Sequence, residues 1–107
     1  MVSIARATLS SDIFLLDEPL TGLDFVNRLT VEKKLLSMRD GKNTMVMILH
    51  DIESAILLCD RLVILSPKPT RIKAMLSIAL SKTRNHETRF SPEFQRVASE
   101  VYSIISE

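Results

Sequence analysis

Two adjacent carboxylates, Asp17 and Glu18, directly follow the apolar run of residues 13–16 (IFLL). Burying an unpaired carboxylate is costly, so acids at the end of a buried element usually face a cation. At the end of a strand, an aspartate can help to hold Mg²⁺ while the next acid orients or deprotonates an attacking water. Pro19 is expected to bias Glu18 toward an extended backbone. The pair indicates phosphate-handling chemistry, and the alternative is a structural cap of a turn or helix.

A histidine occupies the corresponding position after a second apolar run. His50 follows residues 45–49 (MVMIL) and precedes Asp51. A histidine beside a core strand is often a purely structural residue. At the same edge of a sheet as Asp17 and Glu18, however, its imidazole could hydrogen-bond a terminal phosphate as negative charge develops there.

The elements that must position these side chains alternate along the chain. Continuous apolar runs at residues 13–16, 45–49 and 62–65 are typical of strands that helices cover on both faces. Helical patterns at 25–39 and 52–59 separate them, with Asp24 and Asp51 as predicted N-caps and Gly41 as the terminator of the first helix. This order predicts a parallel β-α-β-α-β core, with ligands beyond the carboxyl ends of its strands.

The remainder of the chain shows a different pattern. The segment SPKPT predicts a turn, and residues 71–78 predict a more exposed edge strand. Ser91, Pro92 and Glu93 have the residue types that begin a helix. An apolar stripe on that helix predicts a core or docking surface, and comprises Phe94, Val97, Ala98, Val101 and Ile105.

Composition limits the function classes. A chain of 107 residues forms one compact domain or a piece of a larger one, and a net charge of +1 gives no support for general polyanion binding. The single cysteine, Cys59, cannot form an internal disulfide, as is usual in a reducing compartment. The sequence has neither a signal-peptide pattern nor an apolar run of roughly 18 residues, which predicts a cytosolic chain.

Longer segments resemble one known family. IFLLDEPLTGLD resembles the Walker B segment and D-loop of the ATP-binding cassette (ABC) transporter ATPases. MVMILHDIESAILLCDRLVILS is similar to their switch-histidine strand, the next helix and the next strand, and SIARAT resembles the helix after their LSGGQ signature. The similarity extends over residues 3–66 with the motifs in family order and spacing, so the set is far more specific than the acid pair alone.

The resemblance implies ATP and Mg²⁺ as cofactors and a role for each motif residue. Asp17 would act on Mg²⁺ through water, Glu18 would be the catalytic glutamate that polarises the hydrolytic water, and His50 would contact the γ-phosphate. The D-loop, which crosses to a second ATPase subunit, would comprise Thr21, Gly22, Leu23 and Asp24.

The sequence departs from the family at the phosphate loop. A G-x-x-x-x-G-K-[ST] loop needs two glycines at that spacing, but the chain has only Gly22 and Gly41 and also lacks LSGGQ. Residues 1–107 are therefore expected to be the C-terminal part of an ABC ATPase domain. The expected fold is a partial P-loop NTPase-type α/β domain, and the chain alone is expected to be inactive.

The tail indicates a subfamily of importers. LSPKPTRI and SPEF are similar to segments in the ATPases of nitrate, sulfonate and taurine importers, which implies coupling of ATP hydrolysis to uptake of a small anionic solute. Residues 66–89 contain six Lys or Arg and one Glu, and could face anionic lipid or a permease; a solvated surface is the alternative.

The resemblance also implies partners and a location. The expected partners are the missing N-terminal half of the domain, a second ATPase subunit, a membrane permease and, indirectly, a solute-binding protein, but not nucleic acid. The location would be cytoplasmic and peripheral, at the inner face of the cell membrane. The alternative function is that of a truncated or split non-enzymatic remnant that keeps only interaction surfaces.

Overall fold

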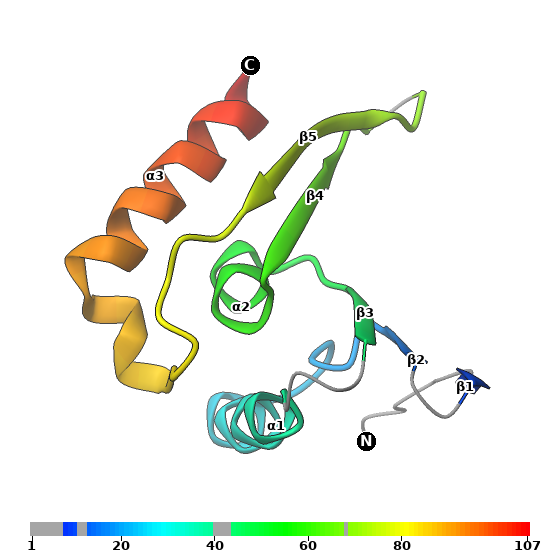
Figure 1. Ribbon diagram of the computed structural model, residues 1–107, viewed down its shortest axis with the longest axis vertical. Coiled ribbons are helices and arrows are strands. Elements are labelled where there is room, and N and C mark those ends of the chain that lie inside the picture. Colours follow the sequence, from blue (N-terminus) through cyan, green and yellow to red (C-terminus); the bar gives the residue numbers. More distant parts are fainter. Residues whose placement is uncertain (1–7, 11–12, 40–43, 68) are drawn as a thin grey trace. The chain divides into compact units, whose positions relative to one another are not determined.

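The computed structural model describes residues 8–10, 13–39, 44–67 and 69–107 (Figure 1). The chain divides into two compact units, Met1–Asp51 and Ile52–Glu107. Across the described ranges there are three α-helices and two β-sheets, one sheet in each unit. This confirms the α/β class. No helix in these ranges has the length and apolar character needed to cross a membrane.

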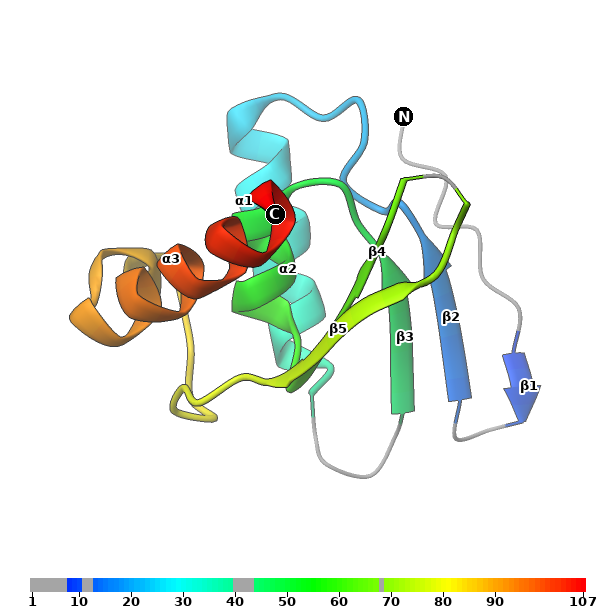
Figure 2. The ribbon, with the colours of Figure 1, turned by 90° about the horizontal axis from the view of Figure 1, so that it is seen from above.

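The first unit contains a three-stranded sheet in the order β1-β2-β3. Strands β2 (Ile13–Asp17) and β3 (Thr44–Ile48) are parallel and pair in register from Ile13 opposite Thr44 to Asp17 opposite Ile48 (Figure 2). Helix α1 (Phe25–Ser37) connects them. The predicted β-α-β unit is thus confirmed, and its parallel register brings the carboxyl ends of both strands to the same edge.

Strand β1 (Thr8–Ser10) differs from the prediction. The resemblance implied a helix over residues 3–8, but Thr8 pairs with Phe14 in an antiparallel arrangement of β1 and β2. Pairing with an adjacent edge satisfies backbone groups that a helix would satisfy internally. The other residues of that predicted helix, 3–7, lie outside the described residues.

Helix α1 begins as its sequence predicts. The Asp24 side chain accepts a hydrogen bond of 2.8 Å from the backbone N–H of Asn27, which confirms Asp24 as the N-cap. The helix ends two residues before the predicted boundary, and Gly41, its predicted terminator, lies outside the described residues. Among the residues of this unit whose burial the structure describes, the buried leucines are Leu16, Leu20 and Leu35.

The second unit contains the predicted third strand in an unpredicted pairing. Strand β4 (Arg61–Leu65) pairs antiparallel with β5 (Ile72–Ser77) in a separate two-stranded sheet, whereas the sequence predicted one parallel sheet containing β4. The turn between them explains this local pairing. The Ser66 N–H donates to the Arg71 carbonyl at 2.8 Å, and the Ser66 hydroxyl donates to the Pro69 carbonyl at 2.7 Å.

Three helical segments complete the second unit: α2 (Ile52–Leu58), the 3₁₀ helix η1 (His86–Phe90) and α3 (Pro92–Ser106). Ser91 accepts a hydrogen bond of 3.1 Å from the Phe94 N–H and Pro92 is the first helical residue, as predicted. Helix α3 packs against α2 and η1. Phe94, Ala98 and Val101 of the predicted stripe are buried, but Ile105 is 42% exposed.

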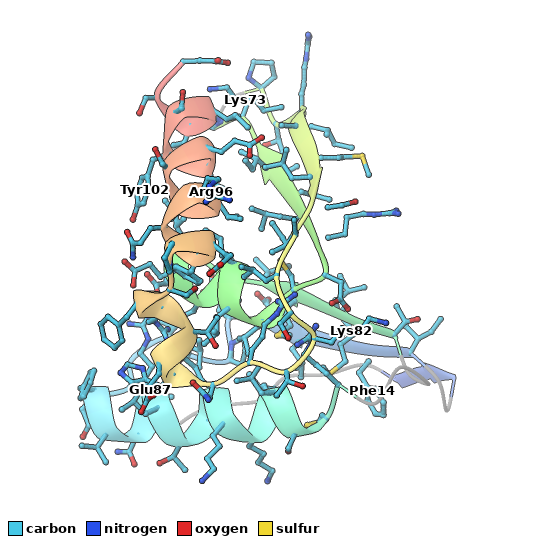
Figure 3. The ribbon with its side chains drawn as sticks, turned by 60° about the vertical axis from the view of Figure 1, so that its left-hand side comes forward. Phe14, Lys73, Lys82, Glu87, Arg96 and Tyr102 are labelled. Atoms are coloured by element: carbon cyan, nitrogen blue, oxygen red, sulfur yellow. The ribbon has the colours of Figure 1, made fainter. Side chains whose placement is uncertain are left out.

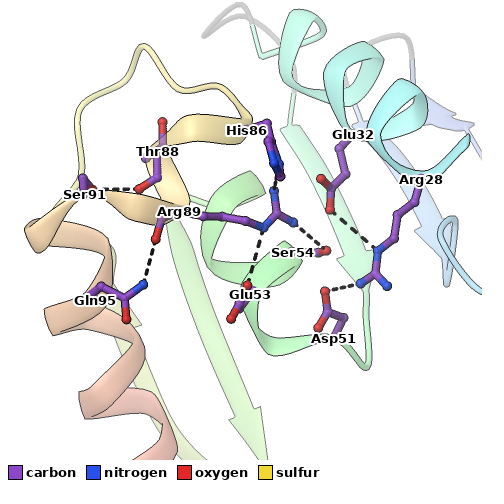
Figure 4. A network of polar contacts seen from close by, with 10 residues as sticks. All are labelled: Arg28, Glu32, Asp51, Glu53, Ser54, His86, Thr88, Arg89, Ser91 and Gln95. Atoms are coloured by element: carbon purple, nitrogen blue, oxygen red, sulfur yellow. Dashed lines mark hydrogen bonds and ion pairs between the residues drawn. The ribbon is translucent and has the colours of Figure 1, made fainter. Parts of the chain in front are cut away.

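The basic stretch of residues 66–89 is partly used inside the unit. Arg84 is buried, and its Nη1 donates to the carbonyls of Leu57 at 3.1 Å and Cys59 at 2.6 Å, at the carboxyl end of α2. The Arg89 Nη2 donates to Ser54 Oγ at 3.3 Å (Figure 4). The Lys73 Nζ, near the end of α3 in Figure 3, donates to the Glu107 carbonyl at 2.9 Å. Arg84, Arg89 and Lys73 thus have structural contacts within the unit, a role that neither a lipid-facing patch nor a solvated surface includes.

Candidate functional site

The candidate site lies at the carboxyl ends of β2 and β3. Asp17 is the last residue of β2, and the Glu18 N–H extends the ladder by donating to the Ile48 carbonyl at 2.8 Å. His50 Nε2 contacts Glu18 Oε1. The parallel register thus brings together the three residues for which the sequence predicted chemistry, at the edge where it placed them.

The backbone of Glu18 corrects one expectation. Its φ of 50° lies in the left-handed region, not in the extended region that Pro19 was expected to favour. Both of its peptide groups are hydrogen-bonded, because the N–H reaches Ile48 and the carbonyl accepts from the Thr21 N–H at 3.3 Å. These contacts outweigh the local preference. A non-glycine residue pays about 1–2 kcal/mol for this conformation, and such residues concentrate at functional sites.

The predicted D-loop residues form the turn between β2 and α1. The Leu23 N–H donates to the Leu20 carbonyl at 3.4 Å, and Gly22 has a φ of 81°, which glycine adopts without steric cost. Thr21 and Gly22 are exposed, whereas Asp24 uses its carboxylate to cap α1. Asp24 therefore has a structural role in addition to the role that the resemblance implies.

A pocket of about 210 Å³ lies beside this turn. The residues that line it come from the predicted D-loop turn, from α1 and from the segment that contains the predicted switch histidine. They are Leu20, Thr21, Gly22, Leu23, Arg28, Leu49, His50 and Asp51. Asp17, Glu18 and Asp24 are not among them.

The sequence reasoning missed the role of Arg28. Its Nη2 forms an ion pair with Asp51 Oδ2, and its Nε lies 4.0 Å from Glu32 Oε2 (Figure 4). The spacing of Arg28 and Glu32 is an i,i+4 helical pair that could have been recognised in the sequence. The contact with Asp51 joins residues 23 positions apart, and no local pattern indicates it.

The donor set fits Mg²⁺ bound through water. Within the described ranges there is no group of three His, Cys, Asp or Glu that could hold a metal by itself. Mg²⁺, however, usually keeps several waters and binds one or two carboxylates together with substrate phosphates. The exposed Asp17 carboxylate, directly beside Glu18, meets that requirement.

Comparison with known sequences shows which class of protein has the motifs that form this site. No family model matches the chain. The chain is related to ATP-binding proteins of ABC transporters, which confirms the resemblance found in its motifs. The aliphatic sulfonates import ATP-binding protein SsuB of Bacillus subtilis is 38% identical over 104 residues, covering 95% of this chain and 40% of that protein.

Two further relatives support the same class. SsuB of Bacillus anthracis is 39% identical over 102 residues, covering 94% of this chain and 39% of that protein. A putative ATP-binding protein of Brucella abortus biovar 1 is 30% identical over 105 residues, covering 96% of this chain and 40% of that protein. The chain spans about 40% of the length of the relatives it matches.

Proposed function

We propose that residues 1–107 are the C-terminal portion of the ATP-binding and ATP-hydrolysing subunit of an ABC importer. The observation that carries the proposal is the parallel pairing of β2 with β3, which brings Glu18 into contact with His50 beside Asp17. The names of the relatives, which describe ATP binding and import, support the same reading.

In this proposal the chain supplies the hydrolytic edge of the nucleotide site. Mg²⁺ bound near Asp17 through water would neutralise phosphate charge. The Glu18 carboxylate accepts a hydrogen bond from the hydrolytic water and increases its nucleophilicity. His50, which contacts Glu18 through Nε2, is placed to donate a hydrogen bond to a γ-phosphate oxygen as charge develops there.

The proposed partners follow from the parts that the chain does not supply. The rest of the ATPase domain would provide the phosphate-cradling loop. The exposed residues Thr21 and Gly22 of the D-loop would contact a second ATPase subunit. A permease and a solute-binding protein would complete the importer at the cytoplasmic face of the membrane. The transported solute would be a small anion, and the names of the relatives favour an aliphatic sulfonate, a class that includes taurine, over nitrate.

The exposed apolar side chains support assignment as a portion of a larger protein. Val46 and Ile48 on β3 are 49% and 50% exposed, and Leu65 and Ile72 on the second sheet are 56% and 63% exposed. Exposed apolar groups on a sheet face are typical of surfaces that another segment or partner covers.

The second candidate is a split or truncated non-enzymatic remnant. The structural roles that Asp24 and the Glu18 backbone already have favour it, because Asp24 caps α1 and the Glu18 carbonyl accepts from the Thr21 N–H in the turn. Residues at the proposed site would then serve only as turn and helix caps.

An assembled ATPase distinguishes the two candidates. The chain is co-expressed with the N-terminal part of a relative that carries the Walker A loop and LSGGQ, and Mg²⁺-dependent ATP hydrolysis is measured. The proposal expects turnover, and expects Glu18→Gln to lower it by about 10²–10⁴-fold while ATP binding is retained, since an amide cannot take a proton.

Asp17→Asn should weaken the Mg²⁺ dependence, and His50→Ala should slow hydrolysis without abolishing binding.

Glu100→Gln on the exposed side of α3 is the matched control and should hydrolyse ATP at the parent rate. If Glu18→Gln also retains the parent rate, the catalytic assignment is wrong. An assembly that binds ATP but shows no turnover supports the remnant.

A further inference from the structure

We propose that Arg28 is a positioning residue for His50, acting through its ion pair with Asp51. The inference deepens the proposed function and rests on it for its catalytic meaning. Its structural content, that Arg28 determines where the His50 side chain lies, can be tested without ATP.

Arg28 is well placed for this role because its own backbone is anchored. It lies in the first turn of α1, and its N–H donates to the carbonyl of the N-cap residue Asp24 at 2.9 Å. Its guanidinium pairs with Asp51 through Nη2 and faces Glu32 through Nε at 4.0 Å (Figure 4). A planar guanidinium with several donors can hold two carboxylates in a defined geometry, which an ammonium does less well.

The segment after β3 is held from two directions. On one side, Glu18 bonds the Ile48 carbonyl through its backbone and contacts His50 through its side chain. On the other side, Arg28 holds Asp51. The His50 side chain is 80% exposed, so packing alone does not orient it, and these polar contacts must do so.

The same contact connects two predicted motifs. The turn that includes Thr21 and Gly22 leads directly into α1, and it lines the same pocket as Arg28 and His50. A displacement of α1 would therefore move Asp51 and, with it, His50. Arg28 thus couples the proposed D-loop to the proposed switch histidine.

Histidine NMR on the 107-residue chain provides a direct test. The chain has two histidines, His50 in the first unit and His86 in the second, so His86 is an internal reference. The probe is the set of imidazole resonances and the nuclear Overhauser contact between the His50 ring and the Glu18 side chain. Arg28→Gln should shift the His50 resonances and remove that contact, and should leave His86 unchanged.

Three further variants separate positioning from a general loss of charge or structure. Lys33→Gln removes an equal charge from an exposed position on the same helix and should leave His50 unchanged. Arg28→Lys should restore the contact only in part. The exchange of Arg28→Asp with Asp51→Arg should restore it, although each single change removes it. A half-exposed ion pair adds little to global stability, so these variants should fold.

The assembled ATPase gives the catalytic readout. Arg28→Gln should lower kcat about tenfold with little change in KM for ATP, because a misplaced catalytic group affects the chemical step. An unchanged Glu18–His50 contact in Arg28→Gln, or a charge exchange that fails to restore it, would overturn the inference. A parent assembly without turnover counts against the proposed function alone, because the NMR result is independent of ATP.

Discussion

Glu18 combines a chemically active side chain with a backbone conformation that glutamate rarely adopts. Its φ of 50° is held by hydrogen bonds at both of its peptide groups, and its carboxylate reaches His50. The conformation orients the side chain at the carboxyl edge of the sheet. The positive φ of Glu18 indicates that the position of its side chain matters more for function than the small loss of stability that this backbone conformation causes.

Replacing Glu18 by glycine should therefore separate stability from function. Glu18→Gly should not lower the free energy of unfolding of the chain, and should raise it by up to about 1 kcal/mol, because glycine adopts a positive φ without steric cost. Asp17→Gly, in the extended strand β2, is the control and should lower it by about 0.5–1 kcal/mol. Urea denaturation measures both. A clear loss of stability in Glu18→Gly would show that the left-handed backbone is not strained.

At the scale of elements, Arg84 connects several segments of the second unit through hydrogen bonds at the end of α2. Its side chain is 1% exposed, and its Nη1 donates to the carbonyls of Leu57 and Cys59 while its Nε donates to the Ser81 carbonyl at 2.7 Å. The last carbonyls of a helix have no partner within the helix, and a cation there also interacts favourably with the helix dipole. One guanidinium thus joins the end of α2, the residues that precede β4 and the connection that follows β5.

Loss of that guanidinium should destabilise the unit. Arg84→Met keeps much of the side-chain volume but leaves buried carbonyls without their donor, which should cost about 2–3 kcal/mol. Arg96→Met, at an exposed position on α3 (Figure 3), is the matched control and should change stability by less than about 0.5 kcal/mol. Urea unfolding followed by circular dichroism compares them. Equal midpoints for the two variants would contradict the role given to Arg84.

At the scale of the whole molecule, the chain carries one edge of the proposed nucleotide site without its phosphate cradle. Asp17, Glu18 and His50 would face Mg²⁺ and the γ-phosphate, but the sequence has no Walker A loop. Most of the affinity for a triphosphate comes from the backbone N–H groups and the lysine of such a loop.

The isolated chain should therefore neither bind nor hydrolyse ATP appreciably. Titration calorimetry with millimolar Mg-ATP should show no saturable isotherm, and the Glu18→Gln variant should behave in the same way. Saturable binding with micromolar affinity would mean that residues 1–107 contain a nucleotide site that the proposed function does not include.

The sequence alone determined the features that depend on neighbouring residues. The apolar runs predicted β2, β3 and β4, and the capping residues Asp24 and Ser91 correctly placed the start of α1 and of α3. These features could be predicted because strand character and capping depend on residue types a few positions apart. The parallel β2–β3 pairing followed from the intervening helix, and with it the common edge for Asp17, Glu18 and His50.

Only the tertiary structure decided how β4 pairs and which side chains and backbone groups meet distant partners. The pairing of β4 with β5, the positive φ of Glu18, the ion pair of Arg28 with Asp51 and the burial of Arg84 all differ from, or add to, what the sequence predicted. In the last three, a backbone or side-chain group forms hydrogen bonds or ion pairs with groups 20 or more positions away. Such bonds outweigh local preferences of about 1 kcal/mol, and no short sequence window contains both partners.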